Sequence, residues 1–411
     1  MTETALVPKK DNISIGPVEL VVLQGTPFCN LNCSYCYLTK NSRRDKSIMA
    51  ISLIDTIFDK ILSSQYLGLG LRISWHSGEP LVLGTSYYRQ AIDTIIKIKI
   101  AKCSPDFSIL FDIQTNGTLI NQEWCDFFNE YNDVLSVGVS CDGPSFLHDT
   151  HRKNWVGKPT HKLTQAGMDL LCKNNIKFDL IAVVSREGLD YPAQFIDFFT
   201  RYTDHIQEFH FNLHDEIILQ GDESESLKIY AKKYDFFLNF LLNILNEDSA
   251  LRRPKIRNFS SFYNMLFSKE GKSLHYDARS MSHPFKSLTF DTKGNVSTFY
   301  AGLTIDDCKD LYKDGCGLIV GNIVEHDLDQ IAATSKLKKI ADDFEQSHQV
   351  CEAECDYYGL CSGGYNLIKF KRFGKFDVAE TPECYIHVKT FARSLLDHLN
   401  DSNDLRQNNA F

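Results

Sequence analysis

The feature that most constrains the fold is an alternation of short apolar, β-branched runs with amphipathic stretches in the first half of this 411-residue chain. Helical patterns such as 52–64, 86–99 and 192–202 separate the runs. Six strand–helix units in succession predict a parallel sheet with right-handed crossovers. Six units are fewer than the eight of a closed barrel, so we expect an α/β fold built on an open, partial (β/α)6 TIM-like barrel. The six runs lie at 18–24, 71–76, 108–115, 135–141, 178–184 and 208–213.

Unusual segments follow the first four runs. They are a loop with three cysteines (26–40), "SGEP" (77–80), "NGT" (116–118) and "DGP" (142–144). Ligands of parallel α/β proteins gather at the carboxyl ends of the strands. We therefore expect these four segments to converge on one rim and to form a ligand site there.

Composition narrows the function class. Hydrophobic residues at 43% and charged residues at 24% are typical of an ordinary globular protein with a proper core. The net charge of −9 argues against a nucleic-acid-binding surface, and no apolar run is long enough for a signal peptide or a membrane span. We expect a cytoplasmic protein. In that reducing compartment, clustered cysteines among the 13 of the chain indicate metal binding or redox chemistry.

Cys29, Cys33 and Cys36 form a C-x3-C-x2-C pattern in which one short loop can present three sulfurs. Three thiolates can hold a four-iron cluster and leave one iron with a free coordination position. Tyr35, directly before the last cysteine, is placed to cover the cluster or to pack on a flat ligand. The alternative is a zinc knuckle that a distant His or Cys completes.

The stretch "CNLNCSYC" resembles the signature of radical S-adenosylmethionine enzymes, in which the open iron binds the amino and carboxylate groups of that cofactor. "HSGEP" resembles the second motif of this family. The resemblance implies that Gly78 and Glu79 bind the cofactor's amino group, with Ser77 in place of a more usual glycine.

"QTNGT" and "SCDGPSFLHDTHR" resemble blocks of a subgroup, the peptide and protein maturases. This similarity implies that Ser140 and Arg152 hold the cofactor's carboxylate or ribose, that Asn116 lies close by, and that Ile181 flanks the adenine. Arg152 suits a carboxylate because a guanidinium donates two parallel hydrogen bonds.

A second cysteine group, Cys351, Cys355, Cys361 and Cys384, is a complete four-thiolate set for a closed cluster or for zinc. It resembles the C-terminal SPASM region of the maturases, although the spacing begins C-x3-C where C-x2-C is usual. Full SPASM domains carry a further cysteine where this chain has Tyr365. We therefore expect one auxiliary 4Fe-4S cluster beside the cluster that binds S-adenosylmethionine. Cys308 and Cys316 are left unassigned, with a structural role favoured.

The predicted organisation is a barrel followed by a smaller SPASM- or twitch-like domain. Within it we expect a helix at 224–247, a hairpin at 287–300 that turns at Lys293–Gly294–Asn295, and a helix near 386–398. The expected segments are an N-terminal tail (1–13), the barrel (14–235), a helical bridge (236–286), the auxiliary cluster domain (287–398) and a polar tail (399–411).

The resemblance implies a radical enzyme that takes hydrogen from an unactivated C–H bond and oxidises its substrate by two electrons. Its motifs look most like the cyclophane-forming maturases, which join an aromatic ring carbon to a β-carbon in a ribosomal precursor peptide. Implied partners are that peptide and an electron donor such as flavodoxin or ferredoxin. Only 28 residues precede Cys29, so we expect the barrel, the C-terminal domain or a partner to recognise the leader.

Three alternatives stay open: a sulfatase-maturating enzyme that forms formylglycine, a maturase that forms a thioether or another cross-link, and a non-catalytic zinc- or cluster-binding regulator. Asp215, Glu216 and Asp291 are candidates for the proton acceptor. His76, His148 and His151 lie near the motifs, and we expect them to be structural.

Overall fold

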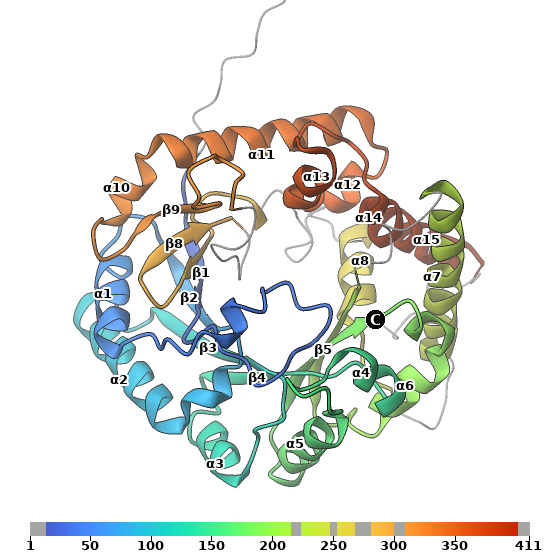
Figure 1. Ribbon diagram of the computed structural model, residues 1–411, viewed down its shortest axis with the longest axis horizontal. Coiled ribbons are helices and arrows are strands. Elements are labelled where there is room, and N and C mark those ends of the chain that lie inside the picture. The colour runs from blue at the N-terminus through green and yellow to red at the C-terminus, as the bar shows by residue number, and fades with distance from the viewer. Residues whose placement is uncertain (1–13, 215–222, 247–252, 268–280, 300–308, 402–411) are drawn as a thin grey trace, which may run out of the picture.

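One sheet runs through the molecule (Figure 1). The computed structural model describes residues 14–214, 223–246, 253–267, 281–299 and 309–401. Within these ranges the sheet has nine strands in the order β6-β5-β4-β3-β2-β1-β7-β8-β9. Their bounds are β1 (Val18–Leu23), β2 (Leu67–Trp75), β3 (Ser108–Thr115), β4 (Leu135–Ser140), β5 (Phe178–Val184), β6 (Ile206–Leu213), β7 (Ser287–Phe290), β8 (Asn295–Thr298) and β9 (Ile319–Asn322).

Strands β1 to β6 are parallel and lie in sequence order, which confirms the predicted partial barrel. Helices cover the outer face of this curved sheet, and α11 runs across the opposite side of the molecule (Figure 1). The helices of the barrel part are α1 (Ile51–Ile61), α2 (Thr85–Lys102), α3 (Gln122–Glu130), α4 (Ser145–His151), α5 (His161–Lys173), α6 (Pro192–Thr200), α7 (Glu223–Asn246) and α8 (Arg257–Phe267). Those of the C-terminal part are α10 (Leu328–Ala332), α11 (Ser335–Glu354), α12 (Tyr358–Cys361), α13 (Asn366–Phe373), α14 (Pro382–Cys384) and α15 (Phe391–Asp401).

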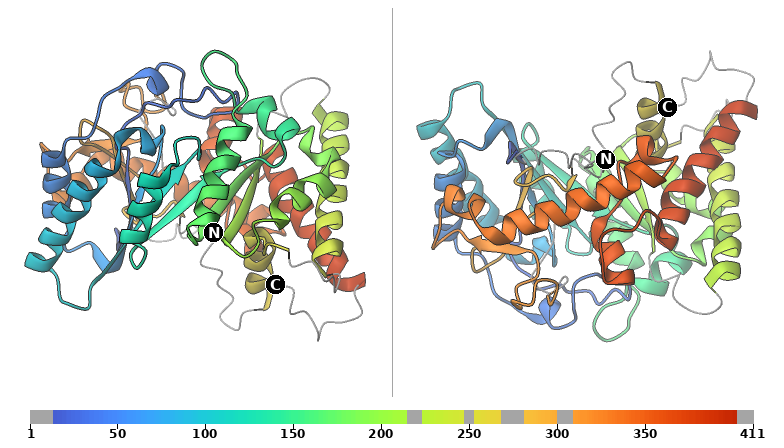
Figure 2. Two further views of the ribbon diagram at one scale, coloured as in Figure 1. Left: turned by 90° about the horizontal axis from the view of Figure 1, so that it is seen from below. Right: turned by 90° about the horizontal axis from the view of Figure 1, so that it is seen from above.

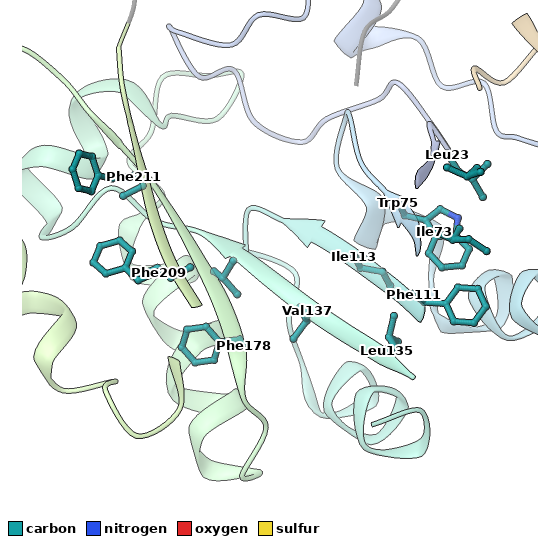
Figure 3. Close-up of a cluster of buried hydrophobic side chains, with 14 of the residues drawn as sticks. Leu23, Ile73, Trp75, Phe111, Ile113, Leu135, Val137, Phe178, Phe209 and Phe211 are labelled. Carbon is teal, nitrogen blue, oxygen red and sulfur yellow. The ribbon is translucent and has the colours of Figure 1, made fainter. Parts of the chain in front are cut away.

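The barrel strands divide their side chains between two environments. In β5 every second residue, from Phe178 to Val184, is buried, and the residues between them are partly exposed. Successive side chains of a strand point to opposite faces, so one set packs under the helices and the other faces the barrel interior. Figure 3 shows part of the packed set, in which the rings of Trp75 and Phe111 stack with centroids 5.6 Å apart.

The C-terminal part continues the barrel sheet, which the sequence pattern did not predict. β7 pairs in parallel with β1, from Leu20 opposite Ser287 to Leu23 opposite Phe290. The expected hairpin is present, since β7 and β8 are antiparallel and Gly294 takes a positive φ of 83° in the turn. The predicted and observed hairpins agree.

Helix α11 was missed by the sequence analysis. Thr334 caps its first turn by accepting a hydrogen bond from the main-chain N of Leu337. Its buried face runs through Leu337, Phe344 and Cys351, so a cysteine of the second group ends an apolar stripe.

The helix expected near 386–398 is split. A π-helix, η5 (Tyr385–Thr390), leads directly into α15. α15 lies beside α7 in all three views (Figure 2). The boundary expected between residues 235 and 236 falls inside α7. The other domain boundaries stay predictions.

Asn258 of α8 forms hydrogen bonds with both main-chain groups of Phe211 in the edge strand β6. Its Oδ1 accepts from the main-chain N of Phe211 over 3.0 Å, and its Nδ2 donates to the main-chain O of Phe211 over 2.9 Å. We expect Asn258→Ala to lower the free energy of unfolding by about 1–3 kcal/mol, because two buried main-chain groups lose their partners. Urea unfolding at unchanged slope measures this. Ser260→Ala, on the same helix, is the control, with an expected change of about 0.5 kcal/mol or less. Equal stability of both variants would contradict the expectation.

Candidate active site

The loop after β1 and the carboxyl ends of β2 to β6 surround one cavity of about 750 Å³. The three thiols of the first cysteine group line it. The predicted cofactor contacts also line it, namely Tyr35, Ser77, Gly78, Glu79, Asn116, Ser140, Arg152 and Ile181. The structure therefore brings together the residues that the motifs singled out separately.

The three-cysteine loop is fastened to the segment 151–155, which follows α4. The main-chain N of Asn32 donates to the main-chain O of Lys153 over 2.7 Å. The indole Nε1 of Trp155 donates to the main-chain O of Cys29 over 2.8 Å. Two hydrogen bonds from this one remote segment thus fix the path of the loop whose three thiols line the cavity.

The chemistry of the thiols fits an iron–sulfur cluster. Burial raises the pKa of Cys29 to about 12 and that of Cys33 to about 11. Buried thiolates need a positive partner, and cluster iron is one. Among the described residues, no group of three or more His, Cys, Asp and Glu side chains could hold a single metal ion. A four-iron cluster instead takes each thiolate on a different iron.

Glu79 forms part of the cavity wall, and its side chain is buried, with 1% exposure. Oε1 accepts from Oγ1 of Thr115 over 2.6 Å and from the main-chain N of Leu81 over 3.0 Å. Oε2 accepts from the main-chain N of Asn116 over 2.8 Å. Burial raises the pKa of Glu79, and these donors oppose the rise. A ligand ammonium group at this carboxylate would complete its shell and favour the ionised form.

A buried carboxylate, Asp142, joins three parts of the cavity wall. Oδ2 accepts from Nε of Arg152 over 2.9 Å and from the hydroxyl of Tyr35. Oδ1 accepts from the main-chain N of Val183 over 2.9 Å. Burial alone would raise the pKa of Asp142, but Arg152 and then His148 hold it below its ordinary value. Nε of Arg152 is committed to Asp142, so its remaining N–H groups are the ones that can meet a ligand.

Asn116, which directly follows β3, completes the wall together with Ser140 of β4 and Ile181 of β5. Nδ2 of Asn116 donates to Oδ1 of Asn30 over 2.8 Å, which ties this residue to the cysteine loop. Oγ of Ser140 accepts from Nε2 of Gln114 over 3.0 Å. Ile181 belongs to the half-exposed set of β5 that faces the barrel interior.

A second cavity of about 440 Å³ contains the second cysteine group. Its lining includes Cys351, Cys355, Cys361 and Cys384, as expected from the four-thiolate set. Burial raises the pKa of Cys384 to about 12, so its thiolate also needs a positive partner. The donor set fits a fully ligated cluster.

The two cavities adjoin. Asn212, Tyr365, Ile368 and His387 line both of them. Tyr365 occupies the position that corresponds to a further cysteine in full SPASM domains. A molecule that reaches from one group of thiols to the other therefore passes these four side chains.

Of the three proton-acceptor candidates, the structure describes Asp291 alone. Asp291 lies in the β7–β8 turn, where Oδ1 accepts from the main-chain N of Lys293 over 2.8 Å, and it is absent from the cavity lining. A role for Asp291 as proton acceptor stays a prediction. Asp215, Glu216 and Cys308 lie outside the described residues. Cys316 lines neither cavity.

The three histidines near the motifs differ in position. His76 lines the cavity, and burial lowers its pKa. His148 lies behind the cavity wall, and its pKa falls to about 4, mainly through burial. Nδ1 of His151 lies 2.7 Å from Oγ of Ser34 in the cysteine loop. His76 thus belongs to the cavity lining, whereas His148 and His151 do not; a structural role for the three histidines stays a prediction.

Sequence reasoning missed two functional candidates. Asp142 lies in the "DGP" segment and is the partner of Arg152, and a buried arginine signals that some carboxylate must be near. Lys369 lines the second cavity from α13. The sequence gives little signal for it, because Lys369 shares its helix face with the polar residues Asn366 and Arg372.

Residues 23–199 match the radical SAM superfamily. An uncharacterised protein of Synechocystis sp. is 33% identical over 95% of this chain and 94% of its own length. A serine-type anaerobic sulfatase-maturating enzyme of Bacteroides thetaiotaomicron is 34% identical over 47% of this chain and 46% of its own. A cysteine-type enzyme of Clostridium novyi is 25% identical over 87% and 90%.

Two solved structures share the fold. One is anSMEcpe with bound AdoMet, with a TM-score of 0.73 at 23% identity over 94% of this chain and 98% of that one. The other is Streptococcus suis SuiB bound to the precursor peptide SuiA, with a TM-score of 0.56 at 16% identity over 87% and 74%. Among the described residues, no helix is long and apolar enough to cross a membrane.

Gly78 is required by its surroundings. A Cβ at this position would lie 2.4 Å from the main-chain O of Thr26 and 2.7 Å from that of Phe28, and φ is +69°. We expect Gly78→Ala to displace Glu79 and to weaken S-adenosylmethionine binding at least about tenfold, a cost of about 1.4 kcal/mol. Equilibrium dialysis on reconstituted protein measures the affinity.

Gly84→Ala is the matched control for this substitution. Its φ is +73°, yet a Cβ there would meet nothing within 4 Å. An alanine there also takes a positive φ, and so carries backbone strain, but it makes no clash. Equal loss of affinity in both variants would show that backbone strain, and not the contact with Thr26, governs the effect.

Proposed function

The chain belongs to the radical S-adenosylmethionine superfamily, and on this premise we propose that it is a maturase that oxidises a ribosomally made precursor peptide by two electrons. The observation that carries the proposal is the pair of adjoining cavities, one lined by three thiols and the other by four. A three-thiol set leaves one cluster iron open for the cofactor, and a four-thiol set closes the second cluster.

In the first cavity the proposed ligands are Cys29, Cys33 and Cys36 for the cluster. Bound S-adenosylmethionine supplies a carbon radical that removes one hydrogen atom from the substrate. Glu79 accepts hydrogen bonds from the cofactor's amino group, and the free N–H groups of Arg152 meet its carboxylate or ribose. Asn116 and Ser140 contribute polar contacts, Ile181 and Tyr35 flank the flat parts, and Ser77 and Gly78 form the turn.

The second cavity completes the oxidation. After the loss of one hydrogen atom, the substrate must lose one further electron and one proton. Cys351, Cys355, Cys361 and Cys384, which line this cavity, would hold an auxiliary cluster able to accept that electron, and the proton would pass to solvent water. An external donor such as flavodoxin or ferredoxin supplies the electron that starts each turnover.

The peptide would lie between the cavities, against Tyr365, His387, Asn212 and Ile368. These side chains offer one aromatic ring, one imidazole, one amide and one aliphatic group, which suits a mixed apolar and polar peptide segment. The product we propose is a cyclophane, in which a ring carbon of an aromatic residue bonds to the β-carbon of a nearby residue. The aromatic and aliphatic wall favours a substrate with an aromatic side chain.

The second candidate is formylglycine formation on a Cys or Ser of a sulfatase. The likeness to two sulfatase-maturating enzymes favours it, since one of them is similar over most of its length. Tyr365 in place of a cysteine distinguishes this chain from the full SPASM cysteine set. A thioether or another cross-link would need the same two cavities and the same number of electrons.

Iron content tests the two thiol sets. We expect about eight irons in anaerobically reconstituted protein and about four in a Cys29/Cys33/Cys36→Ala triple variant. Release of 5′-deoxyadenosine should occur in the parent and be lost in the variant. About four irons in the parent, all lost in the variant, would contradict the auxiliary cluster. A parent that binds iron and never cleaves S-adenosylmethionine would favour a non-catalytic regulator.

Peptide products separate the two candidate reactions. In a synthetic peptide library, one position carries each amino acid in turn and an aromatic residue stands two positions before it. The library is incubated with enzyme, S-adenosylmethionine and reductant. Sulfatase-type peptides with Cys or Ser are incubated in parallel. We expect the aromatic peptides to lose two hydrogen atoms, to resist fragmentation between the joined residues and to give no reaction with a hydrazide probe. Hydrazide-reactive Cys or Ser peptides would support formylglycine formation instead.

A further inference from the structure

Lys369 of α13 is a buried lysine in contact with a cysteine of the second group. It is 4% exposed and lines the 440 Å³ cavity. Its Nζ donates to Sγ of Cys351 over 2.9 Å, to Oγ of Ser347 over 2.8 Å and to the main-chain O of Ser347 over 3.2 Å. The three N–H groups of the ammonium are thus each provided with an acceptor.

The sulfur is the only one of these acceptors that can carry a negative charge. Among the described residues, no carboxylate forms an ion pair with Lys369. Glu383 lines the same cavity, but its Oε2 accepts from Nε of Arg372 over 2.7 Å. A buried charge is tolerated when an opposite charge compensates it, so Lys369 pairs naturally with a thiolate at Cys351.

Hydrogen bonds to Ser347 fix the position of the Lys369 ammonium group beside the sulfur of Cys351. Ser347 and Cys351 are four residues apart on α11, so they share one helix face. Oγ of Ser347 donates to Oδ1 of Asn366 over 2.8 Å, which leaves its lone pairs for Nζ of Lys369. Two contacts to Ser347 therefore hold the charge against Cys351.

We propose that Lys369 is a positioning residue that raises the reduction potential of the auxiliary cluster. Reduction adds one electron to the cluster, and a fixed positive charge and an N–H group at a ligand sulfur stabilise the reduced form more than the oxidised form. The inference rests on the proposed function for the source of the electron. There, the substrate radical would give up one electron and one proton as its new bond forms; the proton would pass to solvent water and the electron to the cluster.

The midpoint potential of the auxiliary cluster tests this role. It is measured by a redox titration followed by electron paramagnetic resonance, in full-length protein with Cys29, Cys33 and Cys36 changed to Ala so that one cluster remains. Lys369→Met keeps the length of the side chain and removes the charge and the donor. Lys369→Gln keeps a neutral donor. Lys375→Met is the control, because Lys375 is exposed and pairs with Asp377.

We expect the potential to fall in Lys369→Met, to fall by less in Lys369→Gln, and to stay at the parent value in Lys375→Met. The parent here is the Cys29/Cys33/Cys36→Ala variant, in which all the other substitutions are made. Equal midpoint potentials in this parent, in Lys369→Met and in Lys369→Gln would overturn the proposal. So would a triple variant that binds no iron, since Cys351 would then hold no cluster. If Lys369→Met does not fold, the comparison of Lys369→Gln with the parent decides. Peptide oxidation is not part of this measurement, so a failure of the proposed reaction leaves its result intact.

Discussion

The candidate site depends on the buried carboxylate of Asp142, which contacts Arg152, Tyr35 and the main chain of β5 at once. Neither Asp142 nor Arg152 could be buried at this depth alone, because an uncompensated charge away from water is costly. Their pairing couples the cysteine loop, the segment after α4 and the fifth strand into one assembly. The orientation of Arg152 toward the cavity and the path of the loop around Tyr35 therefore have a common cause.

One part of the wall between the two cavities comes from the π-helix η5, which directly follows Cys384. A π-helix accommodates an extra residue per turn, and such segments are frequent at functional sites. It carries His387 to the wall that both cavities share. The last cysteine of the second group, at the end of α14, and the cavity-lining imidazole of η5 are thus only three residues apart.

Much of the barrel and of its rim could be predicted from the sequence, since each of its signals is local. Strand periodicity, the cysteine spacing and the "SGEP" turn act over a few residues, and the carboxyl ends of parallel strands must share one edge. Three features could not be predicted because they depend on contacts between remote segments. They are the pairing of β7 with β1, the ion pair of Asp142 with Arg152 and the contact of Lys369 with Cys351. The long helix α11 was missed because polar residues interrupt its apolar stripe.

The parallel pairing of β7 with β1 has a consequence for how this architecture can be divided. β1 is an interior strand, with β2 on one side and β7 on the other. A cut before Ser287 would leave Leu20–Leu23 as an open, apolar sheet edge, which is a template for aggregation. The C-terminal region is therefore not an interchangeable module attached through a linker. Grafting it between relatives would succeed only if the β1 edge and its hairpin were exchanged together.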